Sequence, residues 1–380
     1  MQPVSRRTVV AGLVATAATH HRQTTDARSQ TLWELARSKG LLFGAAVLKR
    51  HLDDDPHYAS AVTQNCNVLV AEGEMKWGAV EWQRGTLDFS AGDAIAAFAR
   101  LHGQKLRGHA LIWHQALPPW VADVVTSGQG PGLIERHIQD ECRHFGADVM
   151  CWDVANEAVS VGDGRPDGLR RSLWLEHIGP QYIDIAYHAA RKALPATPLY
   201  YNDYGLEQDE PSQDKKRRAV ITLLEGFRKR NVPVDGVGIQ AHLLAGLPFN
   251  VAKFRAFIRD VAQMNYTIHI TELDVRDVRL PADVRLRDVA VADLTSRFLD
   301  TALDEPNVRQ LLTWGLSDKY SWLNGTPGQG RDDGLDERPL PLDGSYQPKP
   351  MMEAIRRSLI GARVRKPDVG VITRDAIAQP

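Results

Sequence analysis

The fold of this chain is indicated by residues 149–157, which run Val-Met-Cys-Trp-Asp-Val-Ala-Asn-Glu. The first six are mainly apolar, β-branched or aromatic, which is typical of a buried strand. Seven further runs of this kind occur along the chain. They cover residues 41–47, 67–71, 105–113, 199–202, 236–240, 267–271 and 310–314. The sequence therefore predicts eight short strands.

Segments with helical periodicity lie between these strands. In residues 288–303, apolar side chains recur at three- and four-residue spacing, through Val291, Leu294, Phe298 and Ala302. In residues 178–194 the same spacing runs through Ile178, Tyr182, Ile185, Ala189 and Ala193. Residues 93–102 and 249–264 resemble them. Eight strand–helix repeats predict an α/β fold, a (β/α)8 TIM barrel. An open doubly wound sheet is the alternative, but no glycine-rich phosphate loop follows the first strand.

Composition limits the partners of this chain. Its 380 residues are 43% hydrophobic, enough for a sizeable core, and 46 basic residues nearly balance 47 acidic ones. This balance argues against partners chosen by bulk charge, so we expect neither nucleic acid nor a membrane surface as a partner. We expect a monomer in which residues 33–360 form the barrel domain. Residues 18–32 are expected to be a flexible segment, and residues 361–380 a strap or a disordered tail.

The first 17 residues read as an export signal. Ser5-Arg6-Arg7-Thr8 precedes an apolar run over residues 9–18, and Ala15-Thr16-Ala17 offers a cleavage site. The paired arginines indicate the twin-arginine route, which would lead to the periplasm or the outside of the cell. An ordinary hydrophobic helix is the alternative, although the run is too short to span a bilayer.

The cysteines and histidines do not indicate a metal or a cofactor. Cys66, Cys142 and Cys151 are an odd number, so at least one thiol is free, and buried free cysteines are the expectation. His109 and His114 are five residues apart, which is no recognised ligand spacing. We therefore expect no metal and no cofactor.

Polar and aromatic residues follow seven of the eight predicted strands. In a barrel, the carboxyl ends of the strands form one mouth, where chemistry is found. The candidate site residues are Glu72, Lys76, His109, Trp113, Asn156, Glu157, Tyr204, Gln240, His242, Glu272, Asp274, Trp314 and Trp322. Each residue alone has an ordinary explanation, such as a solvated carboxylate, a structural histidine or packing at the rim. Their convergence on one mouth predicts a functional site.

Two carboxylates in this set fit the hydrolysis of a glycosidic bond. One carboxylic acid must protonate the leaving oxygen, and a second, ionised carboxylate must attack or stabilise the anomeric carbon. Glu157 ends the fourth strand and Glu272 the seventh. These strands are three places apart around a barrel, so the two side chains can face each other across a bound sugar. A retaining mechanism would place them about 5–5.5 Å apart.

Seven motifs carry a resemblance to a known family. In chain order they are Glu72-x-Glu-Met-Lys-Trp77, Arg107-Gly-His-x-Leu-x-Trp-His114, Trp152-Asp-Val-x-Asn-Glu157, Tyr201-Asn-Asp-Tyr204, Asp235-Gly-x-Gly-x-Gln-x-His242, Ile270-Thr-Glu-Leu-Asp274 and Trp314-Gly-x-Ser-Asp318. Over residues 43–350 the sequence resembles glycoside hydrolase family 10, chiefly retaining endo-1,4-β-xylanases. The resemblance implies xylan or xylo-oligosaccharides as substrate.

The resemblance also implies individual roles. It makes Glu157 the acid/base and Glu272 the nucleophile. We expect His242 and Asn156 to donate hydrogen bonds to Glu272, and Asp274 to hold His242 in one tautomer. The remaining residues would contact sugar: His109, Lys76, Glu72 and Asn156 as polar contacts, Gln240 as a donor near the nucleophile, Trp113, Trp314 and Trp322 as aromatic walls, and Tyr204 as a platform on the leaving-group side. Ordinary rim packing remains the alternative for Tyr204 and Trp322.

One residue departs from the family pattern. The position after Glu72 is usually Asn in the family and contacts a sugar one ring from the scissile bond, but here it is Gly73. This departure leaves the substrate open: a related β-glucan or a decorated xylan is the alternative to plain xylan. A barrel that binds polysaccharide without cleaving it is a third hypothesis, which the presence of both carboxylates disfavours.

Overall fold

The computed structural model describes residues 30–366 apart from residue 327. The expected export signal at residues 1–17 lies outside the described residues, as do residues 18–29 of the expected flexible segment and residues 367–380 of the tail. The division of the chain into these segments therefore stays a prediction. Among residues 30–326 and 328–366, no helix has the length and apolar character needed to cross a bilayer.

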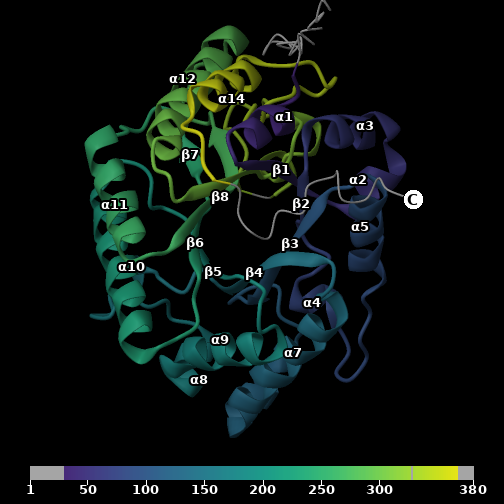
Figure 1. Cartoon of the computed structure of the whole chain (residues 1–380), viewed down its shortest axis with the longest axis vertical. Helices are drawn as coiled ribbons and strands as arrows, with labels where there is room; N and C mark the ends of the chain where they lie inside the picture. Colours follow the sequence, from purple (N-terminus) through teal and green to yellow (C-terminus); the bar gives the residue numbers. More distant parts are fainter. Residues whose placement is uncertain (1–29, 327, 367–380) are drawn as a thin grey trace, which may run out of the picture. The chain divides into compact units, whose positions relative to one another are not determined.

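Parallel strands close into a barrel at the centre of the described chain (Figure 1). The strands are β1 (Leu42–Val47), β2 (Val68–Ala71), β3 (Lys105–Ile112), β4 (Val149–Asn156), β5 (Leu199–Asp203), β6 (Gly236–Ile239), β7 (His242–Leu244), β8 (Thr267–Arg276) and β9 (Val308–Thr313). Each of β1 to β5 pairs with the next strand in order, β6 pairs with β8, and β9 pairs with both β8 and β1. The short β7 pairs with β8 outside this ring. The predicted (β/α)8 barrel is confirmed, with one strand in each predicted run.

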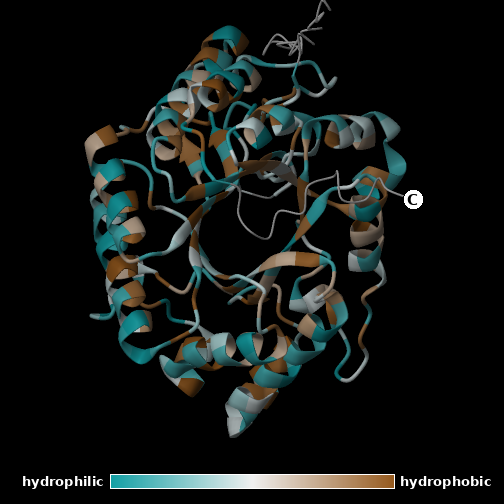
Figure 2. Ribbon diagram, viewed as in Figure 1, coloured by the Kyte–Doolittle hydropathy of each residue, from teal (hydrophilic) through white to brown (hydrophobic). Residues whose placement is uncertain are grey.

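Helices surround the barrel on the outside (Figure 1). They are α1 (Leu32–Ser38), α2 (Lys49–Asp54), α3 (Pro56–Asn65), α4 (Trp77–Val80), α5 (Ser90–Leu101), α6 (Val121–Val124), α7 (Gly130–Phe145), α8 (Leu173–Ile178), α9 (Gln181–Ala193), α10 (Pro211–Arg230), α11 (Val251–Gln263), α12 (Val284–Leu303), α13 (Trp322–Gly325) and α14 (Pro350–Gly361). Figure 2 shows polar and apolar residues alternating around these helices, as expected for amphipathic helices with one face on the barrel.

The prediction of which residues are buried is confirmed for one helix and wrong for part of another. In α12, the predicted residues Val291, Leu294, Phe298 and Ala302 are all buried. In the segment predicted at residues 178–194, the structure corrects the expectation. Gly179 ends α8 directly after Ile178, and α9 begins afresh at Gln181. The break rotates the face, so α9 buries Tyr182, Ile183, Ala186, Tyr187 and Ala190.

A glycine allows tight packing below the mouth. The ring of Trp152 on β4 is fully buried and lies against Gly108 on β3, where a Cβ atom would come within 2.3 Å of it. No other residue fits there without moving the tryptophan. The glycine therefore lets β3 and β4 pair while its neighbour His109 occupies the mouth. Cys66, Cys142 and Cys151 are free and buried, as predicted.

Buried ion pairs attach the long segment before α14 to the barrel. Arg287 on α12 donates from Nε to Asp277 Oδ2 at 2.8 Å, and both side chains are buried. Arg331 Nη1 lies 3.6 Å from the other oxygen of Asp277. Arg276, at the end of β8, pairs with buried Glu337 at 3.1 Å. These contacts hold residues 331–338 against β8 and α12.

The end of the described chain is bound to its beginning. The backbone N–H of Arg365 donates to Lys39 O at 2.9 Å, beside the start of β1. Its buried guanidinium donates to Val308 O at 2.7 Å and to Leu303 O at 2.6 Å. In its described part, the predicted tail is thus a strap, anchored where β9 meets β1.

Candidate active site

The predicted site residues come from the carboxyl ends of the strands. Glu157 directly follows β4, Glu272 and Asp274 lie on β8, and His242 opens β7. The remaining predicted residues are Glu72 and Lys76 after β2, His109 on β3 and Trp113 after it, Asn156 at the end of β4, Tyr204 after β5, Gln240 after β6, and Trp314 and Trp322 after β9. Hydrogen bonds and ring contacts connect most of them into one network at the mouth.

Glu272 is a buried carboxylate held between two donors. Its Oε1 accepts from Asn202 Nδ2 at 2.7 Å, and its Oε2 accepts from His242 Nε2 at 3.1 Å. Burial alone would raise the pKa of Glu272, but the hydrogen bond from His242, the nearby His109 and the bond from Asn202 hold it below its ordinary value. Glu272 is therefore ionised at neutral pH, as a nucleophile must be.

A second carboxylate fixes His242 from behind. His242 Nδ1 donates to Asp274 Oδ1 at 2.9 Å, and Asp274 Oδ2 accepts from Trp322 Nε1 at 2.9 Å. Burial alone would lower the pKa of His242, but the charge of Asp274 and the hydrogen bonds to Asp274 and Glu272 raise it well above its ordinary value. Asp274 therefore fixes the ring and stabilises its charged form, in which both nitrogens donate.

Glu157 is bound differently from Glu272. Its Oε1 accepts from two neutral amides, Gln240 Nε2 at 3.2 Å and Asn156 Nδ2 at 3.3 Å. Its Oε2 lies 3.9 Å from His114 Nδ1. Burial and the charge of Arg170 lower the pKa of His114 to about 4, so this neighbour is neutral. Among the residues that the structure describes, no cation is in hydrogen-bond contact with the carboxyl group of Glu157.

The structure corrects the partner predicted for Asn156. Its amide donates to Glu157, while its Oδ1 accepts from Asn202 Nδ2 at 2.9 Å. Asn202, at the end of β5, is the amide that contacts Glu272. It is fully buried, and its own oxygen accepts from Thr271 Oγ1 at 2.7 Å. The Asn156–Asn202 pair therefore bridges the two carboxylates.

Asn202 lies in the Tyr201–Tyr204 motif but was not predicted as a site residue, because its role depends on partners from other strands. Its position did carry a signal. It closes the fifth strand at the level where Asn156 closes the fourth, and the two residues are register partners across β4 and β5. Polar residues at the matching ends of two adjacent parallel strands lie at the same mouth of the barrel.

A buried ion pair supports His109 from below. His109 Nδ1 lies 3.0 Å from Asp153 Oδ2, and the same oxygen accepts from Arg107 Nε at 2.9 Å. All three side chains are buried. Further down, Arg107 Nη1 lies 2.8 Å from His269 and 3.1 Å from Gln310. This polar layer fills the barrel and fixes the imidazole that faces Trp314, whose ring centre is 5.4 Å away.

Aromatic rings flank a lysine in the mouth. Lys76 Nζ lies 4.7 Å from the ring centre of Trp113 and 5.8 Å from that of Trp314. Burial lowers the pKa of Lys76, an effect that the charges of Glu272 and Glu72 oppose. Burial also raises the pKa of Glu72 to about 7, against the charge of Lys76. An amine beside two indole rings, with the charge of a carboxyl group acting on it, offers both polar and apolar contacts to a sugar.

Tyr204 lies at the rim of the site and is 38% exposed. Its hydroxyl accepts from Arg170 Nη2 at 2.9 Å, and Lys216 Nζ lies 3.6 Å from its ring centre. Two cations therefore hold this partly exposed ring. Trp322 is half-buried and 5.6 Å from the ring of His242. Its bond to Asp274 connects it to the network, beyond ordinary rim packing.

Gly73 has room for a side chain. Its φ lies outside the left-handed region, and an added Cβ would meet only Leu48 Cδ2, at an ordinary 3.7 Å. The backbone of this position therefore does not require glycine.

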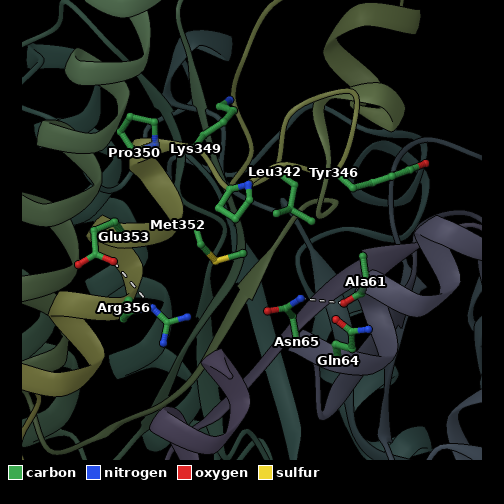
Figure 3. A pocket seen from close by; sticks show the side chains of 11 residues that line it. Ala61, Gln64, Asn65, Leu342, Tyr346, Lys349, Pro350, Met352, Glu353 and Arg356 are labelled. Carbon is green, nitrogen blue, oxygen red and sulfur yellow. Dashed lines mark hydrogen bonds and ion pairs between the residues drawn. The ribbon is translucent and has the colours of Figure 1, made fainter. Parts of the chain in front are cut away.

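Two other features of the described chain bear on its chemistry. Among residues 30–326 and 328–366, no three His, Cys, Asp or Glu side chains are grouped to hold a metal ion. A groove of about 690 Å³ lies between α3 and the start of α14, with Gln64, Asn65 and Arg356 among its lining residues (Figure 3). None of the predicted site residues lines this groove.

Proteins similar to this chain include several xylanases. Residues 31–358 match the family model described as glycosyl hydrolase family 10. Endo-1,4-beta-xylanase 5 of Pyricularia oryzae is 33% identical over 350 residues, 89% of this chain and 81% of that protein. The crystal structure of native xylanase 10B from Thermotoga maritima has a TM-score of 0.78 at 32% identity and covers 87% of this chain and 98% of its own. Xylanase 10B from Thermotoga petrophila, in complex with xylobiose, has the same TM-score and identity and covers 87% of this chain and 97% of its own.

Proposed function

The chain belongs to glycosyl hydrolase family 10 and is an endo-1,4-β-xylanase that acts with retention, and from this premise we propose that Glu157 is its acid/base and Glu272 its nucleophile. One observation carries the assignment. Glu272 accepts hydrogen bonds from a charged histidine and an amide, whereas Glu157 accepts only from neutral amides. The first environment favours a carboxylate, and the second tolerates a carboxylic acid.

These environments suit the two steps of retaining hydrolysis. In the first step, Glu272 attacks the anomeric carbon while Glu157 gives its proton to the leaving oxygen. A covalent glycosyl ester on Glu272 results. In the second step, Glu157, now a carboxylate, takes a proton from water as that water displaces Glu272. The bridge through Asn156 and Asn202 keeps the two carboxyl groups in fixed relation through both steps.

We further propose which residues hold the sugar. Lys76, Glu72 and His109 would contact hydroxyl groups at the reaction centre and the next ring. Trp113, Trp314 and Trp322 would form the apolar walls, because an indole face packs on the C–H face of a pyranose. Tyr204 would support the sugar on the leaving-group side. The substrate is then a xylan chain or xylo-oligosaccharide lying across the barrel mouth.

The setting of the enzyme is also a proposal. The Arg6-Arg7 pair and the short apolar run after it support export by the twin-arginine route to the periplasm or beyond. In this proposal, residues 1–17 are the signal, residues 18–32 a flexible segment, residues 33–360 the catalytic domain and residues 361–380 a tail. The near-neutral charge of the chain supports the proposal that it has no nucleic acid or membrane partner, and we propose a monomer.

The roles can be separated with leaving groups of different acidity. Glu157→Ala should lower kcat/KM on xylan by about a hundredfold or more, since general acid catalysis typically contributes 10²–10⁴-fold. The same variant should keep kcat/KM on a dinitrophenyl xylobioside, because that phenol leaves without a proton. Glu272→Ala should lose both activities. If the two variants lost activity in the same pattern on both substrates, the assignment would be wrong.

A further inference from the structure

The segment after Glu157 folds back on itself as a hairpin. Val159 and Leu169 form an antiparallel bridge, Ser160 N donates to Gly168 O at 2.9 Å, and Arg170 N donates to Ala158 O at 2.8 Å. The turn brings Arg170 beside Glu157, although thirteen positions separate them in the sequence.

The guanidinium of Arg170 joins two parts of the site. Its Nε donates to the backbone oxygen of Glu157 at 2.6 Å, and its Nη2 donates to the hydroxyl of Tyr204 at 2.9 Å. Glu157 has a φ of 56°, in the left-handed region that a non-glycine residue adopts only where its surroundings hold it. Its N–H is fixed by Asn202 O at 2.8 Å, so Arg170 fixes the other side of the same residue.

The ring of Tyr204 is held from a second direction. Lys216 on α10 is buried, pairs with Asp203 at 2.6 Å, and places its Nζ 3.6 Å from the ring centre. The backbone N–H of Tyr204 donates to Asp203 at 2.9 Å. Lys216 therefore sets the plane of the ring, and Arg170 sets the position of its hydroxyl end.

We infer that Arg170 is a positioning residue for proton transfer. It holds the backbone of the acid/base and the aromatic platform in one fixed relation, so that the carboxyl group of Glu157 meets the leaving oxygen of a sugar resting on Tyr204. This inference rests on the proposed roles of Glu157 and Tyr204. The inference rests on two hydrogen bonds, which run from Arg170 to the backbone oxygen of Glu157 and to the hydroxyl of Tyr204, and Arg170→Lys tests the contribution of its charge.

The test compares a substrate whose leaving group must receive a proton from Glu157 with a substrate whose leaving group needs no proton. Arg170→Met keeps the length of the side chain and removes both hydrogen bonds. We expect kcat/KM on a xylo-oligosaccharide to fall about tenfold or more, the factor typical of a lost hydrogen bond from a charged donor. On a dinitrophenyl xylobioside, kcat/KM should change by less than about threefold, since that leaving group needs no acid. An arginine that served only the stability of the fold would not separate the two substrates.

Matched variants sharpen the result. Arg171→Met changes the next residue, which is exposed and whose side chain contacts only the Asp163 carbonyl at 3.4 Å, so it should leave both rates unchanged. Arg170→Lys keeps the charge but cannot bridge both partners, and should show a smaller loss with the same dependence on the substrate. It also serves if Arg170→Met folds poorly. Tyr204→Phe removes only the hydroxyl and should raise KM on the oligosaccharide more than it lowers kcat.

Four outcomes would overturn the inference. Two concern Arg170→Met: an equal loss of kcat/KM on both substrates, or a loss no larger than that of Arg171→Met. The other two are full activity of Arg170→Lys and a Tyr204→Phe variant that reproduces the whole effect on kcat. Glu157→Ala, measured beside them, separates this failure from that of the proposed function. If Glu157→Ala itself does not distinguish the substrates, the acid/base assignment fails. If it does and Arg170→Met does not, only the positioning role fails.

Discussion

Single residues in this site differ in how far the sequence predicts them. Glu157 and Glu272 were predicted because retaining hydrolysis requires two carboxylates and few other side chains can replace them. Asn202 was not, because its effect depends on two partners, Asn156 and Glu272, that only the folded barrel brings within 2.9 Å and 2.7 Å of its amide. Arg170 was missed for the same reason, since a hairpin brings it to Glu157. A sequence shows which side chains can carry out acid–base chemistry, but it does not show which residues of other strands hold those side chains in place.

Gly73 gives the first prediction at this scale. Gly73→Asn should lower KM for xylo-oligosaccharides about twofold to tenfold, because a net hydrogen bond to sugar is worth about 0.5–1.5 kcal/mol. The melting temperature should not fall, since an added Cβ has space and φ is not left-handed. Steady-state kinetics on xylotriose and longer oligomers would measure the effect. Gly73→Ala, which adds the Cβ without the amide, is the matched control and should leave KM unchanged.

An unchanged or higher KM in a well-folded Gly73→Asn variant would contradict this expectation. It would mean that the pocket has been reshaped around glycine. In that case, the space beside Gly73 could hold a side group of a decorated xylan. Comparing KM on plain and decorated oligosaccharides would test this.

The eight barrel strands were predicted in number and order, whereas other details of the elements were wrong where tertiary contacts decide the outcome. The strand runs in the sequence were apolar and short, and each became a barrel strand. β8 extends to Arg276, beyond the predicted 267–271, because β7 pairs with its second half. The face of α9 was wrong because Gly179 breaks the helical phase. A pairing partner or a break of one residue shifts such details without changing the fold.

The attachment of the segment before α14 gives a prediction at the scale of elements. Arg287→Met should lower the free energy of unfolding by about 3–5 kcal/mol, the cost of leaving one partner of a buried ion pair alone. Asp277 would keep the backbone N–H of Arg338 at 3.2 Å and the longer contact to Arg331 at 3.6 Å, but would lose its hydrogen-bonded cation. Arg285→Met, an exposed position on the same helix, should stay within about 0.5 kcal/mol. Denaturant unfolding of both variants measures the difference, and equal stabilities would show that the pair does not hold this segment.

At the scale of the whole molecule, closure of the barrel was predicted from the count of strand–helix repeats alone. The polar contacts that hold the closed barrel together were not predicted. Arg365, Asp277 and Arg107 form contacts with residues far away in the sequence, and a charged side chain in a sequence gives no sign that it will be buried. Periodicity predicts which residues face inward, whereas the polar contacts between elements depend on the assembled architecture.

The site as a whole should work without a metal ion. Treatment with EDTA followed by desalting should leave both kcat/KM on xylan and the melting temperature unchanged. The reason is that Glu157, Glu272 and His242 supply every charge and proton that the two-step hydrolysis uses. Loss of activity that one specific cation restores would contradict this expectation. Measuring the melting temperature alongside activity separates a catalytic ion from one that stabilises the fold.

Pairing of β1 with β9 sets the order in which this protein can be made. Leu42 pairs with Gln310 and Ala45 with Thr313, so the first strand waits for the last one while the ribosome synthesises nearly the entire chain. Trp314, one wall of the mouth, arrives with that strand. Until then, β1 and β8 each present an unpaired edge, the form of the chain most open to aggregation and proteolysis. The barrel closes in a single late event, when β9 pairs with β1, and the contacts of Arg365 then hold the two strands at this place.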